Sequence, residues 1–287
     1  MLFRDEEKAT NYLSNISYYR LKGYWWDTQT DSTCHKFKPN TYFEDIIDRY
    51  NFDRQLRVIL FDAIERIEIA LRTKMIYHLS LSHGGLWYLD ESLFESVARK
   101  GVEDTVYQHI MKGLWKEFHR SQEVFVKDHH RRYPNEAADA WKALEVGSFG
   151  TLSKLYKCLK NQLPEKASIA QEMGLDSTLI LSSWLESITY VRNIIAHHSR
   201  LWSRDMKKKP TVQVKKPVGD WFANPVTKVQ TEKVFLIISC MIYLCNKVTP
   251  GHQLKVKILA LFERYPNVPI YKLGFLNRWD AEPLWKK

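Results

Sequence analysis

The chain has 287 residues, of which 45% are hydrophobic and 13% aromatic, and it carries a formal net charge of +10. Ten tryptophans and fifteen tyrosines exclude an intrinsically disordered chain and are ample for a buried interior. The positive charge makes RNA, DNA or an anionic lipid surface the first partners to consider, although a basic protein need not have such a partner. The length favours one large domain with additions.

The cysteines and the hydropathy of the chain further limit the classes of protein to which it could belong. The four cysteines form no Cys-x-x-Cys pair, so neither a zinc site nor a disulfide framework is predicted, and we expect no cofactor: Cys34, Cys158, Cys240 and Cys245. Acidic residues stand where a signal peptide would have its apolar run, which favours a cytoplasmic protein. The longest apolar run, residues 234–245, is far shorter than the ~20 residues that span a bilayer and predicts a buried helix.

The N-terminal segment, residues 1–40, contains a short predicted helix over 5–17 and then an aromatic cluster from Tyr18 to Trp26 that includes Arg20 and Lys22. Aromatic side chains beside cations can stack on bases and hold phosphates, as in readers of single-stranded RNA. More often such a cluster wedges a helix pair against the core, with the cations at its rim. A loop containing Ser32 follows.

A long helix is predicted next. Thr41 and Glu44 have the spacing of a capping box, and apolar residues at steps of three and four predict one buried stripe over much of 42–80. On the other side, Glu65, Glu68 and Arg72 form a polar line that is most simply a set of solvated ion pairs. Two consecutive glycines at 84 and 85 end the pattern.

Helices are predicted over five further ranges: 91–100, 104–130, 136–146, 149–161 and 164–173. The second ends in His129-His130-Arg131-Arg132, which could contact RNA, but the helix dipole favours cations at a C-terminus without any ligand, and we prefer that interpretation. Asp176 is the predicted N-cap of the next helix.

Composition changes after Trp202. Two lysine runs with prolines predict an exposed insertion over about 203–230, with a small hairpin. Its lysines could hold an RNA backbone, or the insertion could be only a solvated loop. Helices are predicted over 231–247 and 251–264, and the aromatic C-terminal tail, 265–287, is expected to pack back on the body.

The strongest functional signal lies between Tyr190 and Trp202, where an apolar helical pattern runs into an arginine, an asparagine and two histidines. At 3.6 residues per turn Asn193 and His197 share a face and Arg192 lies at its edge, so the three side chains can point into one small volume. An alternative is that Arg192 and His197 are satisfied polar groups of the core.

Cleavage of RNA needs a deprotonated 2′-hydroxyl, a protonated 5′-oxygen and stabilised charge on phosphorus. An imidazole near its ordinary pKa of ~6.5 can act as acid or base, an arginine can hold the phosphate, and an asparagine can orient either. One histidine is few for a reaction that uses both an acid and a base, which suggests that a second copy faces it across a two-fold axis. A metal site is less favoured, since the adjacent histidines diverge on a helix.

Five separated motifs carry a resemblance to a known family. They occur in order over nearly the whole chain: Tyr18 to Tyr24, Glu65 to Arg72, Glu145 to Ser153, Arg192 to Trp202, and Gly274 to Trp285. Together they resemble the bacterial Abi family of AbiD/AbiF type. Arg192-Asn193-Ile194-Ile195-Ala196-His197 resembles the arginine–histidine motif of the HEPN superfamily in its most typical form.

This resemblance implies an all-α, HEPN-type helical bundle that acts in phage defence by abortive infection, as a metal-independent endoribonuclease. Arg192, Asn193 and His197 inherit the catalytic roles, with Ala196 as the small spacer, at a composite site between two motif copies of a homodimer. The family is akin to toxins held by antitoxins, and its AbiF branch is associated with a small non-coding RNA. The alternative is a non-catalytic protein that holds a structured small RNA.

Further residues follow from the same reading. Arg72 and His78 have a loose version of the motif spacing, but we interpret Arg72 as structural or as a support of the site. The supporting residues are Glu65, Glu68, Arg72 and His198. The candidate RNA-binding residues are Tyr19, Arg20, Lys22, Arg131, Arg132, Arg200, Lys207, Lys208, Lys209, Lys215 and Lys216.

Overall fold

The computed structural model describes residues 1–31 and 36–286. Within these ranges the chain forms twelve α-helices, several short 3-10 turns and one two-stranded antiparallel hairpin, so the prediction of an all-α fold is confirmed. Ser32 of the predicted loop and Cys34 lie outside the described residues. The other three cysteines are free and buried.

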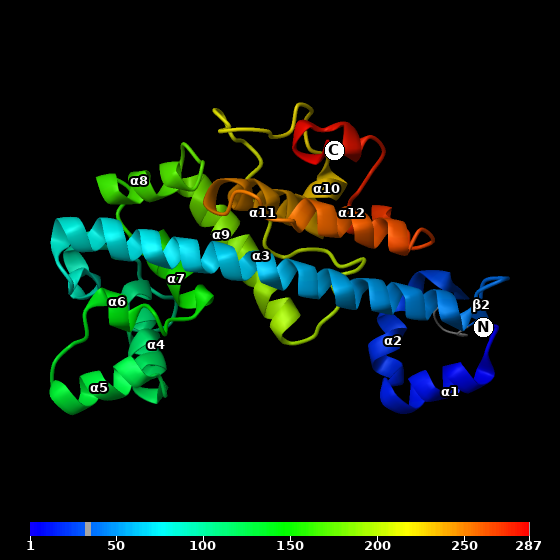
Figure 1. Ribbon diagram of the computed structural model, residues 1–287, viewed down its shortest axis with the longest axis horizontal. Helices are drawn as coiled ribbons and strands as arrows, with labels where there is room; N and C mark the ends of the chain where they lie inside the picture. The colour runs from blue at the N-terminus through cyan, green and yellow to red at the C-terminus, as the bar shows by residue number, and fades with distance from the viewer. Residues whose placement is uncertain (32–35, 287) are drawn as a thin grey trace.

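One helix organises the molecule. The helix α3, Phe43–His83, has 41 residues and crosses the whole width of Figure 1. The predicted apolar stripe is confirmed, because six of its eight members from Leu56 to Leu71 are buried, and Ile59 and Ala70 are partly buried. The helices packed on α3 include α2, α7, α8, α9, α11 and α12. The helix ends at Gly84, whose φ of 78° lies in the left-handed region that favours glycine.

The predicted capping box at the start of α3 is wrong. Tyr42 is the N-cap and its side chain makes no capping bond. Thr41 instead donates to the Lys38 carbonyl at 2.9 Å, and Glu44 Oε1 accepts from the backbone N–H groups of Arg4 and Asp5 at 3.0 and 3.1 Å. The Glu44 carboxylate therefore bonds to the N-terminal segment and not to the N-terminus of its own helix.

The N-terminal segment forms two short helices and the hairpin: α1 Glu6–Asn15, α2 Tyr18–Trp25, β1 Gln29–Asp31 and β2 Lys36–Phe37. The aromatic cluster therefore lies on α2. Tyr24 and Trp25 are buried against α3, whereas the Tyr19 side chain is 82% exposed. The packing interpretation is confirmed for the inner face of the cluster, and the RNA-binding interpretation stays a prediction for its exposed outer face.

The middle of the chain differs most from the prediction. Over 91–100 only the 3-10 turn Glu91–Leu93 is helical, because Phe94 leaves it in an extended conformation and bridges to Leu159. The predicted helix 104–130 is two helices, α4 Val106–Arg120 and α5 Val124–Arg132, separated where Ser121 adopts an extended conformation. A true capping box, Thr105 with Gln108, begins α4.

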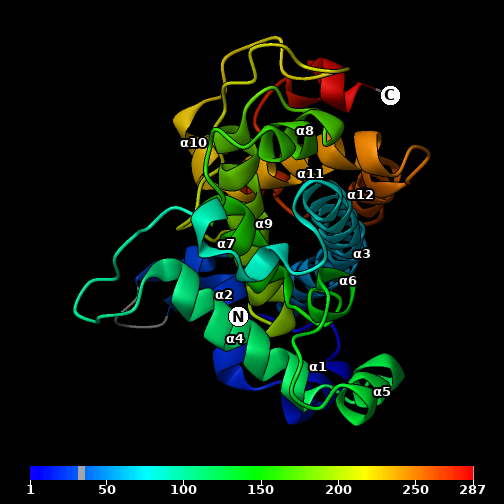
Figure 2. The same ribbon diagram turned by 90° about the vertical axis from the view of Figure 1, so that its left-hand side faces the viewer.

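The next helices are α6 Ala140–Ala143, α7 Phe149–Cys158, α8 Pro164–Glu172 and α9 Thr178–Ala196. The helix α8 begins at a proline, as predicted. The N-cap of α9 is Ser177, whose side chain accepts from the Ile180 N–H, so the assignment to Asp176 is wrong by one residue. Viewed almost along α3, α7 and α9 lie beside it and α4 and α5 lie below (Figure 2).

The last helices are α10 Lys228–Glu232, α11 Val234–Val248 and α12 Leu254–Arg264. Every residue of α11 from Val234 to Cys245 is buried, which confirms the prediction of a core helix. Among the described residues no helix is both long and apolar enough to cross a membrane.

The insertion after Trp202 contains no strand between 203 and 227, so the hairpin predicted there is wrong. Its most strand-like part bonds to a helix instead. The Trp184 indole donates to the Thr211 carbonyl at 2.8 Å, and the Thr211 N–H donates to Ser183 Oγ at 3.0 Å. These side chains of α9 take the backbone groups that a second strand would have used.

The C-terminal tail packs on the body, as expected. Trp285 is 1% exposed, its ring stacks on Phe235 of α11 with 5.9 Å between centroids, and its indole donates to Ser239 Oγ at 3.0 Å. The tail is therefore part of the α11 side of the core.

Candidate functional site

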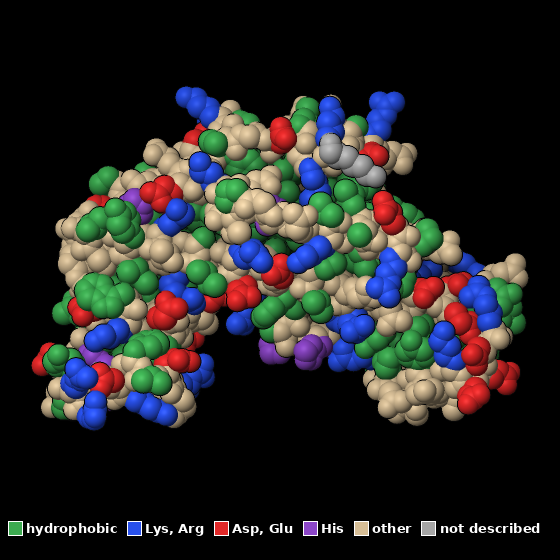
Figure 3. Space-filling model, viewed as in Figure 1, with side chains coloured by type: hydrophobic (Ala, Val, Ile, Leu, Met, Phe, Trp, Pro, Cys, Tyr) green, Lys and Arg blue, Asp and Glu red, His purple; other side chains and the backbone are tan. Residues whose placement is uncertain are grey.

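The C-terminal end of α9 projects from the body. Val191, Ile194 and Ile195 keep the helix against the core, and beyond Ala196 it meets only solvent on one side. In Figure 1 this end points down between α1–α2 and α4–α5, and Figure 3 shows histidine side chains on the surface at the same place. The motif is thus displayed in a recess between two lobes.

The turn that ends α9 is built by its histidines. His197 is the C-cap, and His198 has a φ of 53°, so the backbone reverses there in the left-handed conformation. The N–H groups of His198 and Ser199 then donate to the carbonyls of Ile195 and Ile194, both at 2.9 Å. This turn directs the following residues back towards α3.

A buried carboxylate fixes the segment after the turn. Asp53 of α3 is fully buried and accepts hydrogen bonds from the N–H groups of Leu201, at 3.1 Å, and Trp202, at 2.7 Å. The Tyr24 hydroxyl of α2 donates to its other oxygen at 2.7 Å. We call this arrangement the Asp53 latch. Burial raises the pKa of the Asp53 carboxyl, against the hydrogen bonds and the Arg57 charge that favour its ionised form.

Arg57 extends the latch to the histidines. Its Nη1 lies 3.7 Å from an Asp53 oxygen and donates to the carbonyls of His198 and Ser199 at 2.7 and 3.0 Å. Arg20 of α2 donates to the same His198 carbonyl at 2.8 Å. The backbone that carries both histidines is therefore held by cations from two different helices.

The three motif side chains are available to a ligand. Asn193 and His197 are exposed, Arg192 is half-buried, and none of the three makes a hydrogen bond within the described part of the chain. Their exposure argues against satisfied polar groups of the core. Arg192 and His197 nevertheless line different pockets, and His198 lines both.

The pocket at Arg192 lies between α3 and α9, and we call it the α3–α9 pocket. It has a volume of about 380 Å³ and a mostly apolar wall. Val58 and Phe61 of α3 are exposed there by 65% and 45%, and Ile195 and Ala196 form the facing side. An apolar wall of this kind beside a cation suits a macromolecular contact better than a solvated surface.

The pocket at His197, which we call the arginine pocket, lies between α2 and the segment after the turn, with a volume of about 320 Å³. Arg20, Arg200 and Arg204 line it, and none of its lining residues is acidic. Gly23 allows the close approach: a Cβ at this position would lie 2.7 Å from Arg200 Nε. Because position 23 carries no side chain, the Arg200 side chain can lie close to this face of α2.

A comparison with known protein families shows to which family the chain belongs. Residues 11–203 match the family described as Abi-like protein, which covers most of the chain. The chain belongs to the Abi-like family of abortive infection proteins. The matched range contains α2, α3, the end of α9 and every residue of the Asp53 latch. No curated protein and no solved structure matches the chain.

In this Abi-like protein Arg72 is a structural residue. Its guanidinium donates to the carbonyls of Leu144 and Gly147, both at 3.1 Å, and to Glu68 at 2.8 Å. Burial raises the pKa of Glu68, while the charges of Arg72 and Arg192 oppose that shift, so Glu68 links the structural arginine to the motif arginine. Glu65 is exposed, and His78 belongs to a separate pair with Glu172 at 2.9 Å.

The predicted RNA-binding residues of the Abi-like protein fall into separate groups. Tyr19, Arg20 and Arg200 line the arginine pocket with His197. The other candidates lie elsewhere: Lys22 beside the Trp26 ring, Arg131 and Arg132 paired with Asp128, Lys208 paired with Glu186, Lys209 paired with Glu232, and Lys207, Lys215 and Lys216 exposed on the insertion. In Figure 1 the later, yellow part of the insertion rises on the side opposite the projecting end of α9.

Three arginines of this site were missed from the sequence. Arg54 and Arg57 come from α3, and Arg204 follows Arg200 by four residues. An arginine three residues from another on the predicted long helix was a signal for the first pair. Nothing local distinguishes Arg204 from the other cations of the insertion.

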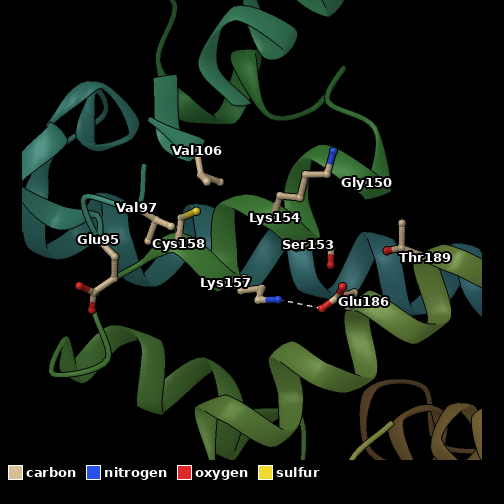
Figure 4. Close-up of a pocket in the computed structure, with 10 residues that line it drawn as sticks. All are labelled: Glu95, Val97, Val106, Gly150, Ser153, Lys154, Lys157, Cys158, Glu186 and Thr189. Atoms are coloured by element: carbon tan, nitrogen blue, oxygen red, sulfur yellow. Dashed lines mark hydrogen bonds and ion pairs between the residues drawn. The ribbon is translucent and has the colours of Figure 1, made fainter. Parts of the chain in front are cut away.

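A separate pocket of about 430 Å³ lies between α7 and α9 (Figure 4). Cys158 and Thr189 line it, and Lys157 and Glu186 form an ion pair of 2.8 Å at its edge. Arg192, Asn193 and His197 do not line this pocket, whereas Gly150 and Ser153 of the motif from Glu145 to Ser153 do. Across the described residues no group of three or more histidine, cysteine or acidic side chains could hold a metal ion.

Proposed function

We propose that this Abi-like protein is an endoribonuclease of the HEPN type that acts in phage defence. The observation that carries the proposal is the display of Arg192, Asn193 and His197 at the projecting end of α9, where their side chains make no hydrogen bond within the described residues. The helix dipole favours basic side chains at this helix end but does not account for the exposed Asn193 between them, so we infer a ligand for the group. The family match and the arginine-rich surroundings point to RNA as that ligand.

The chemistry uses the motif side chains without a metal. His197 takes the proton of the 2′-hydroxyl or gives one to the departing 5′-oxygen, because an imidazole can do either near neutral pH. Arg192 holds the phosphate, and Asn193 orients the imidazole or donates to a phosphate oxygen. The 2′-oxygen attacks phosphorus, the bond to the 5′-oxygen breaks, and the product ends in a 2′,3′-cyclic phosphate.

One chain supplies half of this site. It offers one motif histidine where both an acid and a base act, and Arg192 and His197 line different pockets. A second copy that covers the exposed Val58 and Phe61 would bring its own motif to the first, so the active form is proposed to be a homodimer. Phe61→Glu should then give a monomer with little activity, measured by sedimentation and cleavage together.

The direct test is cleavage of single-stranded RNA by the purified protein in EDTA. His197→Ala should lower the rate by about 100-fold or more, the usual contribution of a general acid or base. The exposed His109 on α4 provides a matched control, and His109→Ala should cleave as the wild type does. Equal rates for His197→Ala and the wild type would remove His197 from the reaction.

A second candidate is a non-catalytic protein that holds a structured small RNA, favoured by the arginine pocket, which can bind a backbone without cutting it. A discrete RNA that copurifies intact with the wild type, and is still bound by His197→Ala, would support this candidate. The two functions are compatible, since a bound non-coding RNA can keep a toxin-like nuclease inactive. Sequencing of the copurified RNA, followed by cleavage assays before and after its removal, distinguishes inhibitor from substrate.

A further inference from the structure

The arginine pocket has an unbalanced charge. Arg20, Arg200 and Arg204 line it together with His197 and His198, and its lining includes no carboxylate. Burial lowers the pKa of the Arg200 guanidinium, and the neighbouring Arg204 charge lowers it further, while Tyr24, Asp53 and Asp27 act in the other direction. Three guanidinium groups at one concave surface repel one another, and an anion placed between them would relieve this repulsion.

The three arginines are held in place by backbone carbonyls. Arg20 donates to the His198 carbonyl at 2.8 Å, Arg204 Nε donates to the Arg200 carbonyl at 2.6 Å, and Arg200 donates to the Trp202 carbonyl. Each bond uses one of the five N–H groups of a guanidinium and neutralises no charge. The donors are therefore positioned and most of them remain available.

The nearest buried acid does not supply the missing charge directly. Both oxygens of Asp53 are occupied by the N–H groups of Leu201 and Trp202 and by the Tyr24 hydroxyl, with Arg57 at 3.7 Å. The latch thus holds the segment beneath the pocket, whereas the charged groups that line the pocket are all basic. A negatively charged group from outside is the complement that this pocket lacks.

An aromatic ring stands at the rim. Tyr19 is 82% exposed, and within the described residues its ring makes one contact, an edge-to-face contact with Tyr18 at 5.5 Å between centroids. A face of the Tyr19 ring is therefore open to solvent next to Arg20. Tyrosine faces beside cations bind unpaired bases by stacking, irrespective of the base.

We propose that the arginine pocket binds one nucleotide of single-stranded RNA, with its phosphate on Arg20, Arg200 and Arg204 and its base stacked on Tyr19. The volume of about 320 Å³ is within the range of small-ligand pockets. This inference rests on the proposed function and deepens it. Since His197 lines the same pocket, the bound nucleotide neighbours the scissile phosphate, and Tyr19 makes the site selective for unpaired RNA.

The test measures binding separately from cleavage. The probe is a fluorescent 2′-O-methyl oligoribonucleotide, which lacks the 2′-hydroxyl needed for cleavage, and its affinity is compared with that of the same sequence in a duplex. Tyr19→Ala should weaken binding of the single strand about tenfold or more and leave duplex binding unchanged. Arg204→Gln should weaken both and lower the salt dependence of binding by about one counterion.

Matched controls are Tyr77→Ala, an exposed tyrosine of α3, and Arg264→Gln on α12, which should bind the probe as the wild type does. Equal affinity of Tyr19→Ala, Arg204→Gln and the wild type would overturn the proposal, even if the wild type cleaves RNA. Weakened binding by both variants in a protein that never cleaves RNA would uphold the nucleotide site and reject the nuclease. The two failures are therefore distinguishable.

Discussion

Asp53 and Trp202 are 149 residues apart in the chain, and the buried Asp53 carboxylate accepts the Trp202 N–H at 2.7 Å. This bond joins the middle of α3 to the segment that follows the motif histidines. The same carboxylate lies 3.7 Å from Arg57, which donates to the His198 carbonyl. Asp53 therefore also helps to position the end of α9. The position of the candidate site thus depends on an interaction inside the core.

Removal of this carboxylate should be costly. Asp53→Ala leaves two buried N–H groups and the Tyr24 hydroxyl without an acceptor and Arg57 without its counter-charge. We expect a loss of about 3–5 kcal/mol in the free energy of unfolding, measured in urea. Asp48→Ala on the same helix, where the side chain is exposed, should change it by less than about 0.5 kcal/mol. A small effect of Asp53→Ala would mean that the latch does not hold this segment.

Periodicity was sufficient to predict the large elements. The helices α3 and α9 have apolar stripes that follow from local spacing, α11 follows from an unbroken apolar run, and the structure contains all three. The failures occurred where a distant partner decides. Glu44 bonds to the chain start and not to its own helix, and Phe94 pairs with Leu159 where a helix was expected. Such contacts leave no trace in a window of ten residues.

The same limit applies to the candidate site. The motif located Arg192, Asn193 and His197 directly, because they lie within six residues at one helix end. The pockets around them depend on the left-handed His198 and on α2 and α3, which lie more than a hundred residues earlier in the chain. Arg204 and Gly23 therefore became visible only when the elements were placed together.

Arg72 should matter to folding far more than a surface arginine does. Arg72→Ala removes the donor of the Leu144 and Gly147 carbonyls and the partner of Glu68, so we expect a loss of about 3 kcal/mol in the free energy of unfolding. Arg66→Ala on the same helix removes an exposed pair with Asp62 and should cost less than about 1 kcal/mol. Equal losses in urea denaturation would contradict a structural role for Arg72.

Lys166 predicts an unusual dependence of stability on pH. Lys166 is 1% exposed, its ammonium group donates to the Lys157 and Leu159 carbonyls at the end of α7, and burial lowers its pKa to about 8. The folded state binds the Lys166 proton less tightly than the unfolded chain does, so the charged lysine lowers the free energy of unfolding. This loss of stability declines as the pH rises through 8 towards the ordinary lysine pKa. Stability relative to Lys166→Met should therefore increase by roughly 2 kcal/mol between pH 7 and 9.5.

Comparison with the variant in urea cancels the titration of the tyrosines, which both proteins share. The exposed Lys154 on α7 is the control, and the difference between wild type and Lys154→Met should stay constant over the same range. A constant difference for Lys166→Met as well would show that Lys166 keeps its proton in the folded protein up to pH 9.5.

A methyl group at Gly23 should separate stability from RNA binding. In the interior of α2, alanine is favoured over glycine by about 0.5–1 kcal/mol, but the new Cβ would lie 2.7 Å from Arg200 Nε and displace that side chain. Since the guanidinium is a flexible end, it can move, so the fold should survive. We expect Gly23→Ala to weaken binding of single-stranded RNA by about tenfold, or ~1.4 kcal/mol, without lowering the free energy of unfolding. Gly113→Ala is the control for helix propensity alone, because Gly113 lies inside α4 with open space around it. This variant should be more stable than the wild type and bind RNA equally well. If both alanine variants bind RNA as the wild type does, the position of Arg200 against α2 has no part in binding.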